Sequence, residues 1–170
     1  AHAGADLYDH HTVVDVDEQS DRVMLTATTA DGSQSIFEGR MLAGCDGPTS
    51  RVRQSVGLAG PSEQLHGVLA FTETPDAGDR VDVHLTAPTF FAWRIPRGDA
   101  GVEYGLAAPP GVAVPALFDQ LTAAYDVAPE RRCSGAIPIG PPDSVTTDRV
   151  FLIGDAAAQT KPFTGGGILY

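Results

Sequence analysis

The sequence predicts an α+β protein with two separate sheet systems, and three observations support this class. Apolar and polar residues alternate in short runs over residues 12–38. A second series of strand-like runs, divided by Pro, Gly and Asp turns, fills residues 65–109 and favours an antiparallel sheet. One strong helical repeat at 114–127 precedes an apolar run near residue 150. We therefore expect three parts, at residues 1–60, 61–140 and 141–170.

Residues 12–60 predict a β-meander followed by a turn and a short helix. The runs "TVVDVDE", "RVMLTATTA" and "QSIFEG" are the expected strands, with "DGS" as a turn between the last two. The short apolar run "RMLAGCDG" ends in a tight Asp-Gly turn. In "PTSRVRQSVGL", Ser50 is a good helix cap and Gly57 a plausible stop.

The second half predicts an antiparallel sheet, a helix and a return strand. The strand-like runs are "LHGVLAFTET", "DRVDVHLTA", "FFAWRIPRGD" and "GVEYGLAAP". The helix is expected in "VPALFDQLTAAYDV", where apolar residues recur at three- and four-residue steps: Val114, Leu117, Leu121, Ala124 and Tyr125. The stretch "RRCSGAIPIGPP" is expected to be extended and turn-rich, and "DRVFLIGD" to be a buried strand.

Composition excludes several functions. The chain carries 22 acidic and 11 basic residues, a net charge of −11, which argues against a nucleic-acid partner. Asp outnumbers Glu, which fits either a high-salt cytoplasm or a generally acidic surface. No apolar stretch reaches the ~18 residues of a membrane span, so we expect a cytoplasmic protein, with peripheral membrane contact left open.

Cysteine and histidine residues give no metal site and no disulfide framework. Cys45 and Cys133 are too few and too far apart for either, and we expect each to pack as a small apolar residue. The five histidines show no metal-ligand spacing. Three residues on predicted strands, His66, His84 and Tyr104, are expected to be structural.

The segment "GCDGPTSRVR" at 44–53 is one candidate ligand site. Asp46 and Gly47 form the tight turn, and Ser50 is placed to cap the next helix. Arg51 and Arg53 bring positive charge close to the helix start, where it could face a phosphate. A capped surface helix with solvated arginines is the simpler reading of the same residues.

The segment "RVFLIGDAAAQTKPFTGGGI" is the second candidate site. Asp155 follows the apolar run, and a carboxylate at a strand end can accept hydrogen bonds from sugar-like hydroxyls. The glycines at 165, 166 and 167 would let backbone N–H groups approach an anion closely. A flexible turn is the alternative.

Together these segments resemble the flavoprotein superfamily with the p-hydroxybenzoate hydroxylase fold, whose "ADG…S.VR" and "GDAA…P..G.G" motifs contact FAD. The resemblance implies part of an FAD-binding α/β domain beside the meander, with an antiparallel substrate domain between the motifs. The implied FAD-binding residues are Asp46, Gly47, Arg51, Gly154, Asp155, Pro162, Gly165, Gly166 and Gly167.

Within that superfamily, "FAWRIPRGD" resembles the aromatic-x-Trp-x-Phe-Pro-Lys motif of the geranylgeranyl reductases, and "GAIPIGPP" and "PFTGGGI" resemble the same branch. Phe91, Trp93 and Pro96 would then line an apolar substrate channel. The sequence departs from the pattern at Ile95 and Arg97, which replace an aromatic residue and a lysine, and at Ala158. From composition alone, "FFAWRIP" reads equally as a core strand.

The resemblance implies a middle segment of an FAD-dependent reductase acting on C=C bonds of isoprenoid lipids, archaeal lipids included, with NADPH or ferredoxin as the reductant. The proton donor is unidentified. The family's N-terminal GxGxxG helix is absent from these residues, so we expect no turnover from this stretch by itself. The alternatives are an aromatic-ring hydroxylase of the same superfamily and a non-catalytic binding module.

Overall fold

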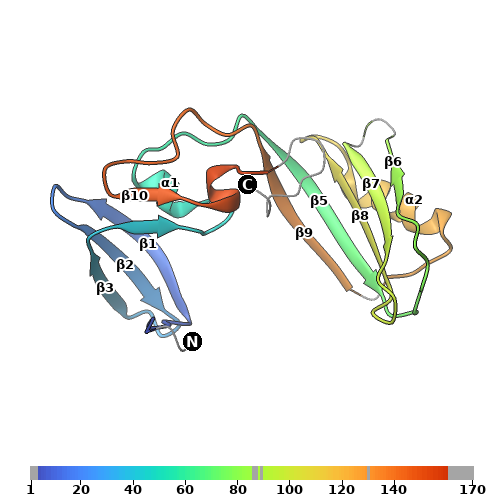
Figure 1. The fold of residues 1–170 in the computed structure, drawn as a ribbon, viewed down its shortest axis with the longest axis horizontal. Helices are drawn as coiled ribbons and strands as arrows, with labels where there is room; N and C mark the ends of the chain where they lie inside the picture. Colours follow the sequence, from blue (N-terminus) through green and yellow to red (C-terminus); the bar gives the residue numbers. More distant parts are fainter. Residues whose placement is uncertain (1–3, 86–87, 89, 130, 161–170) are drawn as a thin grey trace. The chain divides into compact units, whose positions relative to one another are not determined.

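The computed structural model describes residues 4–85, 88, 90–129 and 131–160. It divides the chain into two compact units, and the second is inserted in the first. Unit 1 comprises residues 1–62 and 140–170, and unit 2 comprises residues 63–139. Strands predominate over helices in both units, which confirms the predicted α+β class (Figure 1).

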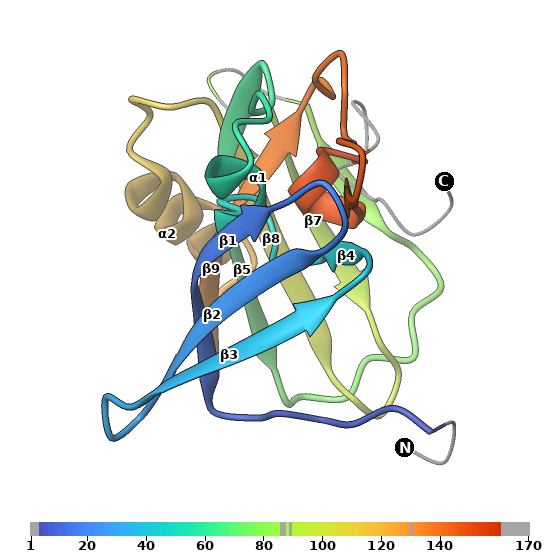
Figure 2. The same cartoon turned by 90° about the vertical axis from the view of Figure 1, so that its left-hand side faces the viewer.

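Unit 1 begins with the predicted meander. Strands β1 (His11–Glu18), β2 (Val23–Thr29) and β3 (Gln34–Gly39) pair antiparallel in chain order, as Figure 2 shows. The β1–β2 register shifts between Val13 and Asp15, which marks a bulge. Val16 and Val23 turn inward from this sheet to the core of the unit.

The rest of unit 1 is built on a parallel pair of strands. These are β4 (Leu42–Gly44) and β10 (Val150–Leu152), which join segments more than a hundred residues apart in the sequence. Two short helical turns follow them: α1 (Arg51–Ser55) after β4, and the 3₁₀ turn η1 (Gly154–Ala157) after β10. A Cβ on Gly44 would lie 2.8 Å from Leu152 and 2.9 Å from Val52, so only glycine allows this close packing.

In unit 2, the described residues form an antiparallel sheet with strand order β6-β7-β8-β5-β9. Its strands are β5 (Glu63–Thr72), β6 (Asp82–His84), β7 (Phe91–Pro96), β8 (Val102–Ala108) and β9 (Arg131–Ile139). The antiparallel sheet expected at residues 65–109 is confirmed. The stretch after residue 130 is extended, as expected, but it is not turn-rich over residues 131–139, because β9 pairs along nine residues with β5.

Helix α2 (Val114–Ala124) covers one face of this sheet (Figure 1). Phe118 is fully buried and packs with Tyr104 and Leu106 of the central strand β8. Burial of apolar side chains between helix and sheet is the main favourable term in a layer of this kind. Among the described residues, no helix has the length and hydropathy that crossing a membrane requires.

The opposite face of the sheet, which we call the groove face, follows from the alternation of side chains along each strand. In register across β7, β8, β5 and β9 lie Trp93, Gly105, Leu69 and Cys133. The next row brings Phe91, Ala107, Gly67 and Gly135 to the same face. Small residues therefore stand at the centre of this face, with larger apolar ones around them.

Candidate functional site

The first part of the candidate site lies in unit 1, at the carboxyl ends of β4 and β10. Because the strands are parallel, residues 45–50 and the turn at Gly154 emerge from the same edge. The amide of Ile153 donates a hydrogen bond to the carbonyl of Gly44 at 2.9 Å, which extends the pairing of β4 and β10 to this edge. Ligands of open α/β sheets bind outside the carboxyl ends of the strands.

Asp46 stabilises the start of α1. Its Oδ1 accepts a hydrogen bond from Ser50 Oγ at 2.6 Å, and its Oδ2 accepts one from the amide of Val52 at 3.0 Å. Partial burial acts to raise the pKa of the Asp46 carboxyl, but these hydrogen bonds outweigh it and hold the pKa below its ordinary value of 3.8. Ser50 also accepts from the amide of Arg53 at 3.0 Å, so the predicted cap is confirmed.

Arg53 connects the two predicted cofactor segments instead of facing a ligand. The side chain is buried, and its guanidinium donates to the carbonyls of Ala156 at 2.9 Å and Pro48 at 3.0 Å. The expectation that Arg53 offers its charge to a phosphate is therefore wrong. Arg51, two residues earlier, is exposed, and its side chain makes no hydrogen bond or ion pair with another residue that the structure describes.

The turn after β10 presents the carboxylate of Asp155. Gly154 has a φ of +64°, and its amide donates to Gln159 Oε1 at 2.9 Å. Ala158 ends the turn in the left-handed conformation, with its amide bonded to the Asp155 carbonyl. The Asp155 side chain is exposed and makes no hydrogen bond or ion pair with any residue that the structure describes.

Two of the predicted glycine positions leave room for a ligand. Gly47 has a φ of +81°, and a Cβ built on it or on Gly154 would meet no atom within 4 Å. Backbone at such positions is open to close approach. The other predicted cofactor residues lie outside the described residues: Pro162, Gly165, Gly166 and Gly167.

The second part of the candidate site lies in unit 2, around Trp93. Its indole lies flat across Gly105, since a Cβ on that glycine would be only 2.0 Å from Trp93 Cζ2. The Phe91 ring packs beside it, with a centroid separation of 5.0 Å and an interplanar angle of 36°. The indole Nε1 donates to Glu103 Oε1 at 3.0 Å.

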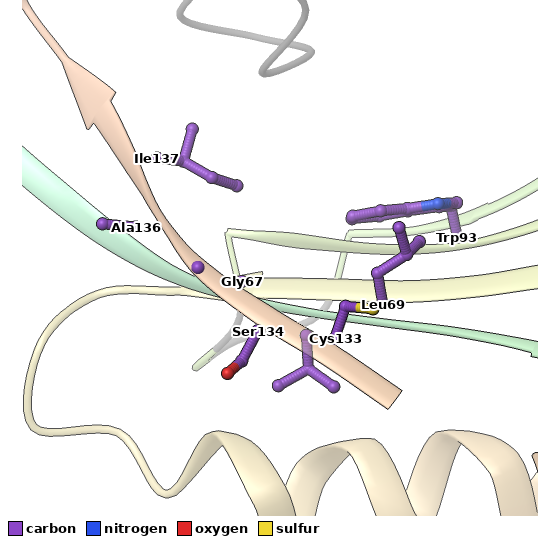
Figure 3. Close-up of a pocket in the computed structure, with 9 residues that line it drawn as sticks. Gly67, Leu69, Trp93, Cys133, Ser134, Ala136 and Ile137 are labelled. Atoms are coloured by element: carbon purple, nitrogen blue, oxygen red, sulfur yellow. The ribbon is translucent and has the colours of Figure 1, made fainter. Parts of the chain in front are cut away.

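Trp93 borders a groove of about 250 Å³ on the groove face. Figure 3 shows Trp93, Leu69 and Ile137 on the side of the sheet away from α2. The groove is lined by Gly67, Val68, Leu69, Trp93, Cys133, Ser134, Gly135, Ala136 and Ile137. None of these described residues carries a charge, so the groove suits an apolar ligand.

The structure brings together only two of the three predicted substrate residues. Phe91 and Trp93 share the groove face, whereas Pro96 alternates to the other face of β7, at the end of the strand. Ile95 takes the corresponding place on the groove face. Pro96 was predicted from its position in the motif. Because side chains alternate between the two faces of a strand, Pro96 and Trp93 lie on opposite faces.

Both cysteines contradict the expectation of buried packing. Cys45 and Cys133 are exposed free thiols. Cys45 lies in the loop after β4, and Cys133 lies on the edge strand β9, where few neighbours can cover it. Cys133 is part of the groove lining, a role that the sequence did not indicate.

Other lining residues were also missed from the sequence. Gly67 and Leu69 alternate along β5 with residues that face α2, and this alternation was a usable signal. Gly135 and Ile137 could not be assigned to a face without knowing that β9 is a strand. Glu103 was missed because its significance depends on the cross-strand position of Trp93.

His84 and Tyr104, which were expected to be structural, lie on the sheet face covered by α2. His84 Nε2 is 2.7 Å from the Tyr125 hydroxyl, which donates to Asp82 Oδ2 at 3.2 Å. Tyr104 is buried in the core under α2. These contacts fit the structural role that was expected of both residues. His66 is exposed on β5.

The fold and the two sites define a class of protein in which an antiparallel sheet with an apolar groove is inserted into an α/β unit. In that α/β unit, the carboxyl ends of the parallel strands form a second ligand site. Residues 1–104 match the FAD-binding domain family, and the chain belongs to this family.

Curated relatives agree with the motif-based resemblance to geranylgeranyl reductases, which is thereby confirmed. A digeranylgeranylglycerophospholipid reductase of Methanopyrus kandleri is 28% identical over 186 residues, covering 99% of this chain and 47% of the relative. One from Methanothermobacter thermautotrophicus is 27% identical over 168 residues, covering 89% and 42%. The chain thus spans a little under half the length of these relatives.

Solved structures confirm the fold. A geranylgeranyl bacteriochlorophyll reductase-like protein from Thermoplasma acidophilum superposes with a TM-score of 0.78 at 18% identity, covering 93% of this chain and 44% of that one. The p-nitrophenol 4-monooxygenase of Pseudomonas putida gives 0.66 at 20% identity, with 93% and 44% coverage. Reductases and hydroxylases therefore share this architecture, and the fold alone does not distinguish them.

Proposed function

We propose that the protein is an FAD-dependent reductase that saturates C=C bonds in the isoprenoid chains of lipid precursors. The observation that carries this proposal is the groove beside Trp93, whose described lining offers no charged group. An isoprenoid chain presents only methyl groups and double bonds, so it must be held by apolar surface and shape. The names of the curated relatives support the same substrate class.

The residues of unit 1 fit FAD at the shared edge of β4 and β10. The exposed carboxylate of Asp155 is free to accept hydrogen bonds from ribityl or ribose hydroxyls. The open backbone at Gly47 and Gly154 allows close approach, and exposed Arg51 can face the pyrophosphate. Asp46 supports the cofactor site indirectly, because its two carboxylate oxygens accept the hydrogen bonds that stabilise the start of α1.

The groove fits a segment of the substrate chain. Its volume of about 250 Å³ is slightly below the ~300–1,000 Å³ typical of ligand pockets, so it accepts part of a long chain. Trp93 supplies a flat wall, while Gly67 and Gly135 leave the floor free of side chains. Apolar contact on these surfaces aligns the chain and excludes water from it.

Bound FAD supplies the hydride chemistry, and the chain's own residues bind and orient. Addition of a hydride to one alkene carbon and a proton to the other balances the reduction. NADPH or ferredoxin would supply the electrons. Because the substrate is a lipid, we also propose peripheral contact with a membrane surface.

Binding to the groove tests the substrate class, and Trp93 is a built-in reporter because it is the single tryptophan of the chain. Geranylgeraniol should change its fluorescence saturably, and alkylation of Cys133 in a Cys45→Ser variant should block that change. Cys133→Ser treated with the same reagent is the matched control. A response to a phenol but not to geranylgeraniol would favour the aromatic-ring hydroxylase, and a response to neither would contradict the proposed substrate.

A further inference from the structure

Glu103 places a carboxylate on the groove face beside the aromatic side chains of β7, in the row that also holds Phe71 and Arg131. The groove-face positions of β8 are Glu103, Gly105 and Ala107. Removing a carboxylate from water is unfavourable unless a hydrogen bond compensates for the lost solvation. The half-buried Glu103 has such a bond, from Trp93 Nε1 at 3.0 Å.

The hydrogen bond runs diagonally across two strands. Trp93 lies opposite Gly105 in the register, and Glu103 is two residues from Gly105 along β8. Diagonal neighbours of this kind are within reach of an aromatic side chain. The indole therefore crosses over Gly105 with its N–H directed to the Glu103 carboxylate, and its benzene ring covers the glycine.

Packing against Gly105 does not by itself select a direction for the indole. Gly105 has no side chain that could stop the ring from sliding or turning over it. The tilted contact with Phe91 is apolar and tolerates rotation. The indole N–H is a donor only, and a charged acceptor gives it one strong and directional partner.

We propose that Glu103 is a positioning residue that fixes the Trp93 indole across Gly105 and thereby sets the wall of the groove. Glu103 is absent from the groove lining and acts through Trp93. The consequence for isoprenoid binding rests on the proposed function. The positioning of the indole does not, so the two can be tested separately.

Two variants of Glu103 and one control test the hydrogen bond between Glu103 and the Trp93 indole. Glu103→Leu removes the acceptor, whereas Glu103→Gln keeps a carbonyl oxygen that can accept from the indole. Glu73→Ala, which removes an exposed carboxylate just beyond the end of β5, is the matched control. Circular dichroism first establishes that each variant is folded.

Time-resolved fluorescence anisotropy of Trp93 in the ligand-free chain is the first measurement. We expect greater indole mobility in Glu103→Leu, wild-type mobility in Glu73→Ala, and restored rigidity in Glu103→Gln. Equal mobility in wild type and Glu103→Leu overturns the proposal, whatever the lipid result.

Geranylgeraniol titration of the same variants is the second measurement. Glu103 affects binding only through the indole, so we expect less than the full effect of a hydrogen bond to a charged group: about threefold to tenfold weaker binding in Glu103→Leu, with Glu103→Gln close to wild type. A mobile indole with unchanged affinity would show that Glu103 does not set the groove wall. Failure of the wild type to bind any isoprenoid would contradict the proposed function, while the anisotropy result on Glu103 would still stand.

Discussion

The guanidinium of Arg53 donates a hydrogen bond to the carbonyl oxygen of Ala156, at 2.9 Å and across 103 residues of sequence. A second bond from the same side chain reaches the carbonyl of Pro48. Arg53 therefore joins the loop after β4 to the turn after β10, the two segments that the sequence identified as cofactor motifs. Their joint geometry depends on this buried cation.

Replacement of Arg53 should destabilise unit 1 strongly. Arg53→Met keeps much of the volume but leaves the buried carbonyl of Ala156 without its donor, which should cost about 2–4 kcal/mol. Urea unfolding measures the loss. Arg51→Met, at an exposed position two residues earlier, should stay within about 0.5 kcal/mol of wild type. Equal effects of the two changes would contradict the assigned role of Arg53.

The carboxylate of Asp46 should make stability depend on pH in the acid range. Its folded pKa is lowered from 3.8, so its contribution is complete above that value and is lost as the pH falls through the lower folded pKa. Asp46→Asn should therefore cost about 0.5–1 kcal/mol at neutral pH, with the difference from wild type shrinking in acid. Unfolding free energies measured at several pH values test this, and a difference that grows in acid would reverse the assigned sign.

The sequence predicted the fold class well because its strongest signals are local. The meander over 12–38, the strands of unit 2 and the Ser50 cap all follow from alternation and turn chemistry within a few residues. Strand β9 could not be predicted in this way, since it contains Gly135 and Pro138 and lacks a clear alternation of apolar and polar residues. Its conformation is imposed by pairing with β5, whose paired residues lie sixty or more positions away in the sequence.

The candidate site was predictable in its motifs but not in its contacts. The two cofactor segments and Trp93 could be found in the sequence. The inward role of Arg53, the separation of Pro96 from Trp93, and the Glu103 hydrogen bond could not. Each depends on register or on contact between distant segments, which a local pattern does not contain. The helix repeat was likewise recognised at 114–127, yet the fully buried Phe118 was not among its predicted residues.

A methyl group at position 105 should displace the indole of Trp93. In Gly105→Ala the new Cβ would lie about 2 Å from the ring, so we expect a destabilisation of about 1–3 kcal/mol and altered tryptophan fluorescence. Gly135→Ala is the control on the same sheet face, because a Cβ there meets no atom within 4 Å. Thermal unfolding and emission spectra of the two variants provide the comparison. An unaffected Gly105→Ala would show that the indole is not held against this glycine.

Loss of the Asp155 carboxylate should weaken flavin binding without affecting the fold. Its side chain is exposed and has no partner among the described residues, so Asp155→Ala should leave the unfolding free energy within about 0.5 kcal/mol. Loss of hydrogen bonds to a charged acceptor predicts an FAD affinity about tenfold to a hundredfold lower. Flavin titration measures it, with Asp148→Ala, at an exposed position before β10, as the control. Unchanged affinity would remove Asp155 from the cofactor site.

The most direct test of the account is a single-turnover reaction of the protein that carries this chain. Its bound flavin is reduced under anaerobic conditions and mixed with a geranylgeranyl lipid, and flavin absorbance and lipid mass are then followed together. The account predicts that flavin is reoxidised as the lipid gains two hydrogen atoms for each turnover. Flavin that stays reduced with the lipid, but is reoxidised when oxygen and a phenol are supplied and the phenol is hydroxylated, would contradict it.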